Sequence, residues 1–202
     1  MSFYSIVYVT FLACAIAISH IKHYSSWRWL LLALNFIYYA VSGTYSVLIL
    51  LAITLFTYVM GQLIGQKKKR WLFVVSVVLL ISPLLLYKYG IPLLNRTAMR
   101  DFLPVGISFY TFQALGYLID IYRGKIIPEK NCLDLALFLS FFPQMLAGPI
   151  SRASSLLPQL KNRTVPTKSN ISNGLKYMTY GLFLKVFCAS ALAVIVDAAY
   201  ND

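Results

Sequence analysis

The feature that most constrains this chain is a series of long apolar runs that contain almost no charge. They cover residues 3–19, 29–41, 45–64, 71–87 and 174–200, the last interrupted by Lys185. A helix of seventeen residues is about 26 Å long, enough to cross the hydrocarbon core of a bilayer. The run 29–41 is shorter and is expected to tilt or to form a hairpin with the next one. Because only 12% of the 202 residues are charged, the sequence predicts an all-α, polytopic transmembrane protein.

Basic residues lie in short patches between the apolar runs. The formal net charge is +12, and four of the cations form the sequence KKKR at 67–70. Cytoplasmic loops are enriched in Lys and Arg, which predicts an outside N-terminus and cytoplasmic loops at 20–28, at KKKR and after residue 122. The turn at 42–44 and the loop at 88–101 are then expected outside. We interpret KKKR as a topology anchor, and the patchy distribution argues against nucleic-acid binding.

The next apolar run, 133–150, is unlike the others because Pro143, Gly148 and Pro149 interrupt it. A strongly basic stretch without acids follows, so a full crossing would place that stretch outside. The pattern favours a broken or re-entrant segment that returns to the cytoplasm, followed by a polar loop at 151–173. Broken backbone at membrane depth requires surrounding protein or a water-filled cavity, which makes this region the best candidate for a site.

Polar residues also occur in the run 103–122. At helical spacing Gln113 and Asp120 share a face with Gly106, Phe109 and Tyr117. One interpretation is structural, with Gln113 bonding a neighbouring helix and Asp120 pairing with Arg123. The other is that Gln113 and Asp120 contact a substrate.

The segment FFPQMLAGPISR adds two candidate site residues, Gln144 and Arg152. They could satisfy the carbonyl groups that Pro143 and Pro149 leave without donors. Alternatively, Arg152 faces an anionic or acyl-carrier ligand at the inner mouth of a cavity. We take Gln113, Asp120, Gln144 and Arg152 as candidate substrate-binding residues.

Several kinds of site are excluded by composition. The two histidines, His20 and His23, are in the first basic loop, so no Ser-His-Asp triad can be assembled. The three cysteines are far apart, which argues against a metal site or a disulfide framework. The residues alone therefore indicate a polytopic membrane protein with a broken, polar segment near its cytoplasmic face.

Two long motifs carry a family resemblance. LPVGISFYTFQALGYLIDIYRG at 103–124 and FLSFFPQMLAGPISRASSLLPQL at 138–160 closely resemble the membrane-bound O-acyltransferase family. The resemblance implies a ring of helices in the bacterial cytoplasmic membrane and no bound cofactor. It also implies a cytoplasmic acyl-CoA or acyl-carrier thioester donor, a cell-envelope polysaccharide acceptor and an extracytoplasmic acetyltransferase as a possible partner.

One departure from the family matters for activity. The family's catalytic histidine matches neither His20 nor His23 and lies in a portion that this sequence does not contain. Residues 1–202 are therefore expected to be a single membrane domain, the N-terminal portion of a longer one, and inactive alone. Two other functions stay open: a transporter or channel lined by the broken segment, and a non-catalytic scaffold for a partner acetyltransferase.

Overall fold

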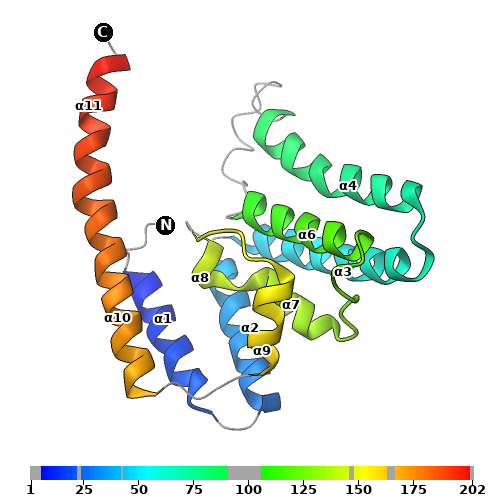
Figure 1. Ribbon diagram of the computed structural model, residues 1–202, viewed down its shortest axis with the longest axis horizontal. Helices are drawn as coiled ribbons and strands as arrows, with labels where there is room; N and C mark the ends of the chain where they lie inside the picture. The colour runs from blue at the N-terminus through cyan, green and yellow to red at the C-terminus, as the bar shows by residue number, and fades with distance from the viewer. Residues whose placement is uncertain are drawn as a thin grey trace. The chain divides into compact units, whose positions relative to one another are not determined.

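The computed structural model describes residues 6–21, 24–41, 43–90, 106–145, 148–162 and 167–200 (Figure 1). Within these ranges the chain is helical and contains no strand, which confirms the predicted all-α class. It divides into two compact units, Met1–Arg163 and Thr164–Asp202. The prediction of one membrane domain over 1–202 stays a prediction.

The first unit contains eight of the described α-helices. They are α1 (Ile6–Ser19), α2 (Tyr24–Val41), α3 (Thr44–Lys67), α4 (Arg70–Leu85), α6 (Ile107–Tyr122), α7 (Cys132–Ser140), α8 (Phe142–Met145) and α9 (Ala153–Lys161). A π-helical turn, η1 (Leu86–Gly90), continues α4. Pro83 lies inside α4 and supplies no N–H, a common cause of such local rearrangement.

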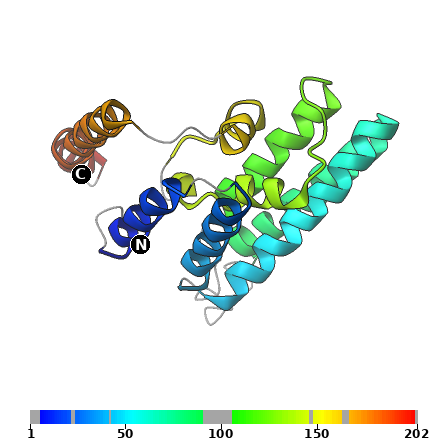
Figure 2. The same ribbon diagram turned by 90° about the horizontal axis from the view of Figure 1, so that it is seen from below.

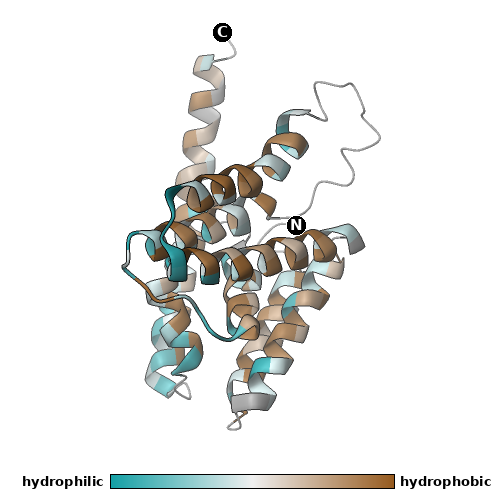
Figure 3. Ribbon diagram, turned by 90° about the vertical axis from the view of Figure 1, so that its right-hand side faces the viewer, coloured by the Kyte–Doolittle hydropathy of each residue, from teal (hydrophilic) through white to brown (hydrophobic). Residues whose placement is uncertain are grey.

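Three segments are long and apolar enough to cross a membrane: Tyr45–Lys67, Arg70–Gly90 and Lys168–Tyr200. Figure 3 shows apolar residues along the lengths of the helices and hydrophilic residues mainly at their connections. The second predicted run is corrected, because α2 begins at Tyr24 rather than at residue 29. Its first turns contain the buried Trp27 and the cation Arg28, which a hydropathy pattern does not mark as helical. Most of the predicted outer loop at 88–101 lies outside the described residues.

Helix α6 packs against both α3 and α4, and these also contact each other (Figures 1 and 2). The close approach of α3 depends on Gly61, where a Cβ would lie 3.1 Å from the ring of Tyr117 and 3.3 Å from Ile121. On the other side, the rings of Phe73 and Tyr122 stack with centroids 4.4 Å apart. Helices α3 and α4 thus hold α6 in place, and α6 contains two of the four predicted site residues, Gln113 and Asp120.

The segment after α6, which we call the re-entrant segment, is not one continuous helix: it consists of α7, a break and the short α8. Helix α7 is capped by Asn131, whose side chain accepts a hydrogen bond from Leu133 N at 3.0 Å, and it ends after nine residues, about 13 Å of rise. The chain breaks at Phe141, forms the short α8 and returns without helical structure through 148–152. Glu129 contacts the chain before and after this segment. Its carboxylate accepts a hydrogen bond from Asn131 N, just before α7, and pairs with Lys161, the last residue of α9. The prediction of a broken segment is confirmed, and its re-entry into the membrane stays a prediction.

The predicted polar loop at 151–173 was wrong in part. Residues 153–161 form α9, and α10 begins at Lys168. The apolar side chains of Ala153, Leu157 and Leu160 recur at helical spacing and are buried. Because most of the intervening residues are polar and one is a proline, composition alone suggested a loop.

Polar contacts attach the re-entrant segment to α2. Arg28 Nη1 lies 3.2 Å from Asp134 Oδ1, and the fully buried Asn35 donates through Nδ2 to Ser140 Oγ at 3.2 Å. Asn35 Oδ1 also accepts from Phe142 N at 3.5 Å, just where the helix is broken. Buried polar groups are costly without partners, so these contacts stabilise the break.

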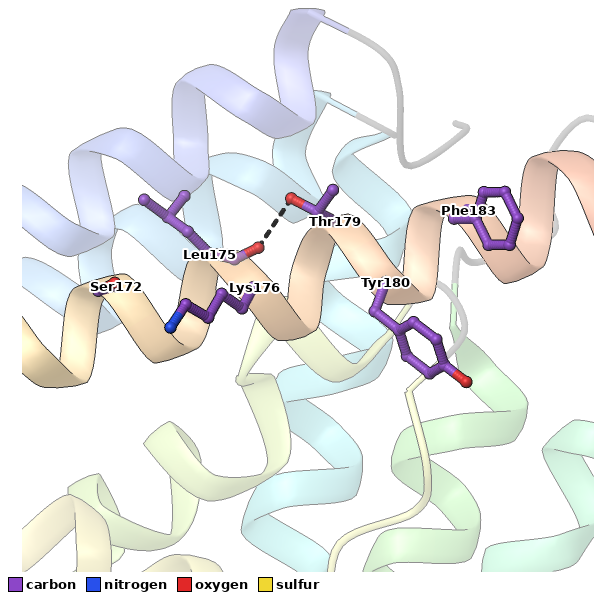
Figure 4. Close-up of a pocket in the computed structure, with 6 residues that line it drawn as sticks. All are labelled: Ser172, Leu175, Lys176, Thr179, Tyr180 and Phe183. Atoms are coloured by element: carbon purple, nitrogen blue, oxygen red, sulfur yellow. Dashed lines mark hydrogen bonds between the residues drawn. The ribbon is translucent and has the colours of Figure 1, made fainter.

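The second unit is one continuous helical segment: α10 (Lys168–Phe183), the π-helical η3 (Leu184–Ala189) and α11 (Ser190–Tyr200). Thr167 caps it by accepting a hydrogen bond from Asn170 N. Figure 4 shows side chains that line a shallow, open hollow along α10, where Thr179 Oγ1 donates to Leu175 O at 2.9 Å.

Candidate functional site

A cleft of about 260 Å³ lies between α6, the loop that follows it and the start of α9. Gln113, Tyr117 and Asp120 line it from α6, since spacings of three and four place them on one helical face. The other lining residues are Gly116, Ile119, Arg123, Lys125, Ile150, Ser151, Arg152 and Ala153. Three of the four predicted site residues, Gln113, Asp120 and Arg152, therefore meet at one cleft.

The turn that ends α6 places Lys125, a cation of the following loop, at the cleft. Gly124 adopts a left-handed conformation with φ 70°, Gly124 N donates to Ile121 O, and Lys125 N donates to Asp120 O at 2.8 Å. These two bonds form a Schellman motif, which reverses the chain after a helix. As a result, Lys125 faces the cleft beside the last turn of α6.

The cleft is electropositive, because three cations, Arg123, Lys125 and Arg152, line it with one carboxylate, Asp120. The predicted pair between Asp120 and Arg123 does not form: the described residues contain no ion pair that involves either of them. All three cations are exposed to solvent. Clustered cations of this kind suit an anionic group such as a phosphate, to which Arg donates two hydrogen bonds at once.

A smaller cavity adjoins the cleft further along α6. It is lined by Phe109, Gln113, Gln144, Pro149 and Ile150, and it has no room for a water molecule. Gln113 and Ile150 line both spaces, so the cleft and the cavity lie next to each other. The fourth predicted residue, Gln144, thus faces Gln113 from the re-entrant segment.

The two glutamines have different hydrogen-bonding states. Gln113 Nε2 donates to Phe138 O of α7 at 3.0 Å, which matches the structural interpretation of this residue. That bond leaves the amide oxygen of Gln113 unpaired within the described part of the chain. Gln144 Oε1 is buried and has no partner among the described residues. Two amide acceptors are therefore unused at the inner end of the cleft.

The return of the chain past Gln144 depends on a glycine. Gly148 N donates to Gln144 O at 2.9 Å, and a Cβ on Gly148 would lie 2.8 Å from Gln144 Cα. Because that neighbour is backbone, it cannot move aside. The sequence pattern identified Gly148 as a breaker, and the structure shows the close approach that requires it.

Sequence reasoning missed the residue that organises the connection from α6 to α7. Glu129 is the only glutamate in the chain. Its backbone and side chain contact groups from α3, α6 and α9. The only signal was a single acid in an otherwise basic loop.

The described residues contain no group of three or more His, Cys, Asp or Glu that could hold a metal ion. His20 Nδ1 lies 2.9 Å from Ile16 O at the end of α1, away from the residues that line the cleft. His23 lies outside the described residues. Within the part of the chain that the structure describes, the cleft thus offers polar and cationic binding groups but no histidine.

Comparison with known proteins gives several relatives of similar kind. The chain is 34% identical over 190 residues to the probable alginate O-acetylase AlgI of Pseudomonas aeruginosa, an alignment that covers 85% of this chain and 36% of the relative. It is 30% identical to the peptidoglycan O-acetyltransferase of Helicobacter pylori, with 86% and 40% covered. It is 29% identical to the teichoic acid D-alanyltransferase of Streptococcus thermophilus, with 79% and 40% covered.

The chain therefore spans less than half the length of these curated relatives. No family model matches the sequence, and no solved structure matches it. What the relatives share by name is the transfer of a small acyl group, acetyl or D-alanyl.

Proposed function

This chain belongs to the membrane-bound O-acyltransferase family, and we propose that it forms the donor-binding part of an enzyme that acylates a cell-envelope polymer. The relatives act on different polymers by name, namely alginate, peptidoglycan and teichoic acid. Acetyl is the proposed acyl group, because the alginate and peptidoglycan relatives, which are the more similar ones, are named as acetyl-transferring enzymes.

The observation that carries this proposal is the electropositive cleft beside the re-entrant segment. Coenzyme A and acyl-carrier proteins both present a phosphate joined to a pantetheine arm that ends in the thioester. Arg123, Lys125 and Arg152 line the cleft, and we propose that they bind that phosphate. The unpaired amide oxygens of Gln113 and Gln144 are suited to accept from the N–H groups of pantetheine.

The arrangement also implies a movement. The cavity between Gln113 and Gln144 has no room for a water molecule in this structure, so we expect the re-entrant segment to shift when the thiol end of a donor enters. Gln144 is the natural moving part, because α8 is a single turn between a break and a non-helical return. Binding of the arm would then supply the missing partner of Gln144 Oε1.

The basic cleft is proposed to face the cytoplasm of a bacterial cell, in a protein that crosses the cytoplasmic membrane several times. The acceptor polysaccharide and an extracytoplasmic acetyltransferase would then act on the far side. A sugar hydroxyl is a weak nucleophile, and a positioned base contributes about 10²–10⁴-fold to its transfer. Because neither His20 nor His23 matches the catalytic histidine that the family resemblance implies, we expect these 202 residues to bind the donor and not to catalyse transfer alone.

The direct test is calorimetric titration of coenzyme A into the purified chain in lipid nanodiscs. We expect saturable binding that Arg152→Gln weakens on the order of tenfold, the loss of about one charge-assisted hydrogen bond. Lys130→Met is the control, since Lys130 is an exposed cation of the loop that carries Lys125 but does not line the cleft. Holo- and apo-forms of an acyl-carrier protein, titrated in parallel, distinguish the two donor sources.

Equal affinity of Arg152→Gln and the unmodified chain would exclude the cleft as the donor site. Transfer of labelled acetyl groups to polysaccharide by the 202-residue chain would contradict the expectation that it lacks catalytic activity. Flux of solutes through proteoliposomes without coenzyme A binding would favour a transporter instead.

A further inference from the structure

We propose that Glu129 is a positioning residue that fixes the spacing of the cations across the cleft. This inference rests on the proposed function, because its readout is the binding of a phosphate-bearing donor. Glu129 itself does not line the cleft, so it acts through the segments that it connects.

The backbone of the loop is fastened at several points. Glu129 N donates to Tyr117 Oη of α6 at 2.8 Å, and Glu129 O accepts from Gln62 Nε2 of α3 at 2.6 Å. The next carbonyl, of Lys130, accepts from Tyr58 Oη of α3 at 2.9 Å. On the preceding side the ring of Pro128 lies against Gly65, with no space for a Cβ. The loop is therefore held rigidly against α3 and α6.

The carboxylate of Glu129 connects this fixed loop to α9. Oε1 accepts from Asn131 N at 3.2 Å, and Oε2 lies 2.5 Å from Lys161 Nζ. The side chain of Glu129 is only 10% exposed, whereas that of Lys161 is 40% exposed. A half-shielded pair of this kind is less screened by salt than a fully exposed one.

The two segments joined by this pair carry cations of the cleft. Lys125 precedes Glu129 in the same loop, and Arg152 directly precedes α9, whose last residue is Lys161. Helix α9 packs on α7 through one buried face, and we infer that the ion pair at its last residue helps to hold it in place. The position of Lys161 at one end of α9 would then influence the position of Arg152 at the other. Breaking the pair would let Arg152 move relative to Lys125 and spoil their joint contact with one phosphate.

Simple electrostatics predicts the opposite result for one variant. Glu129→Gln removes an anion near a cationic cleft and, through the field alone, should strengthen the binding of a phosphate. A positioning role predicts that the same variant weakens it. The sign of the change therefore separates the two accounts.

The experiment compares coenzyme A with pantetheine, which has the same arm but no phosphate, on the full chain in nanodiscs. We expect Glu129→Gln and Lys161→Met to weaken coenzyme A binding on the order of tenfold and to leave pantetheine binding nearly unchanged. Lys161→Arg keeps the ion pair and should retain close to the original affinity for coenzyme A. Lys161→Met, at an exposed site, also carries the test if Glu129→Gln does not fold.

The proposal is overturned if the substitutions strengthen coenzyme A binding or weaken both ligands equally. Unchanged coenzyme A binding in Glu129→Gln, together with a loss in Arg152→Gln, would remove the positioning role and leave the proposed function intact. If Arg152→Gln also binds coenzyme A unchanged, the proposed function itself fails.

Discussion

At the scale of residues, the sequence allowed some of the polar residues of the site to be predicted and not others. Gln113 and Gln144 were predictable as candidates because an amide is rare in an apolar run. Glu129 was not, because its importance comes from contacts with Tyr117, Gln62 and Lys161, which are far away along the chain. The packing of the helices decides which polar side chains contact each other. A single sequence does not show that packing, so these contacts could not be predicted from it. Substrate binding by the four candidate residues stays a prediction.

Asn35 gives a prediction at this scale. Asn35→Leu leaves Phe142 N and Ser140 Oγ without their buried partner at the break in the re-entrant segment. We expect a loss of about 1–3 kcal/mol in the free energy of unfolding. Denaturant titration in a fixed detergent measures it. Ser154→Ala, at an exposed position of α9, is the control and should change stability by less than about 0.5 kcal/mol. Equal stability of both variants would show that the Asn35 contacts are dispensable.

At the scale of elements, long apolar runs predicted helices well and short mixed ones badly. The run 45–64 became α3 (Thr44–Lys67), and the run 71–87 became α4 with its π-helical extension. Helix α9 was missed because only one face of it is apolar and Pro158 lies inside it. The start of α2 was missed because its first turns are stabilised by tertiary contacts such as Arg28 with Asp134. Propensity is a weak guide wherever tertiary packing supplies the stability.

Glycines in the helices give a graded prediction at this scale. Gly65→Ala pushes a methyl group into the ring of Pro128, and Gly61→Ala places one 3.1 Å from the ring of Tyr117. We expect Gly65→Ala to destabilise the chain by about 1–3 kcal/mol and Gly61→Ala by less, because tight packing resists added volume. Gly181 has open space around it, so Gly181→Ala should stabilise by up to about 1 kcal/mol through helix propensity. Thermal unfolding of the three variants checks the order, and a stabilising Gly65→Ala would contradict the contact with Pro128.

At the scale of the whole first unit, the basic connections gather at one end. Gln62 and Gly65, near the end of α3 and close to KKKR, contact the loop at Glu129, and Lys161 at the end of α9 binds the same residue. The positive-inside rule predicted a common side for these segments from charge alone. The contacts support the same conclusion as the positive-inside rule. If residues 132–161 crossed the membrane completely, Lys161 could not reach Glu129.

This arrangement predicts which positions share a side of the membrane. In a variant with alanine at Cys14, Cys132 and Cys188, single cysteines at Ile127 and Asn162 should react with a membrane-impermeant maleimide from the same side. Both positions are exposed, and they lie before and after the re-entrant segment.

Two reference positions make the labelling decisive. Lys68→Cys, in the KKKR turn, should label together with Ile127→Cys and Asn162→Cys, whereas Tyr45→Cys, at the opposite end of α3, should label from the other side. Labelling of Ile127→Cys and Asn162→Cys from opposite sides would mean that residues 132–161 cross the membrane completely. The cleft between Arg123, Lys125 and Arg152 could not then exist, because two of its walls would lie on different sides of the bilayer.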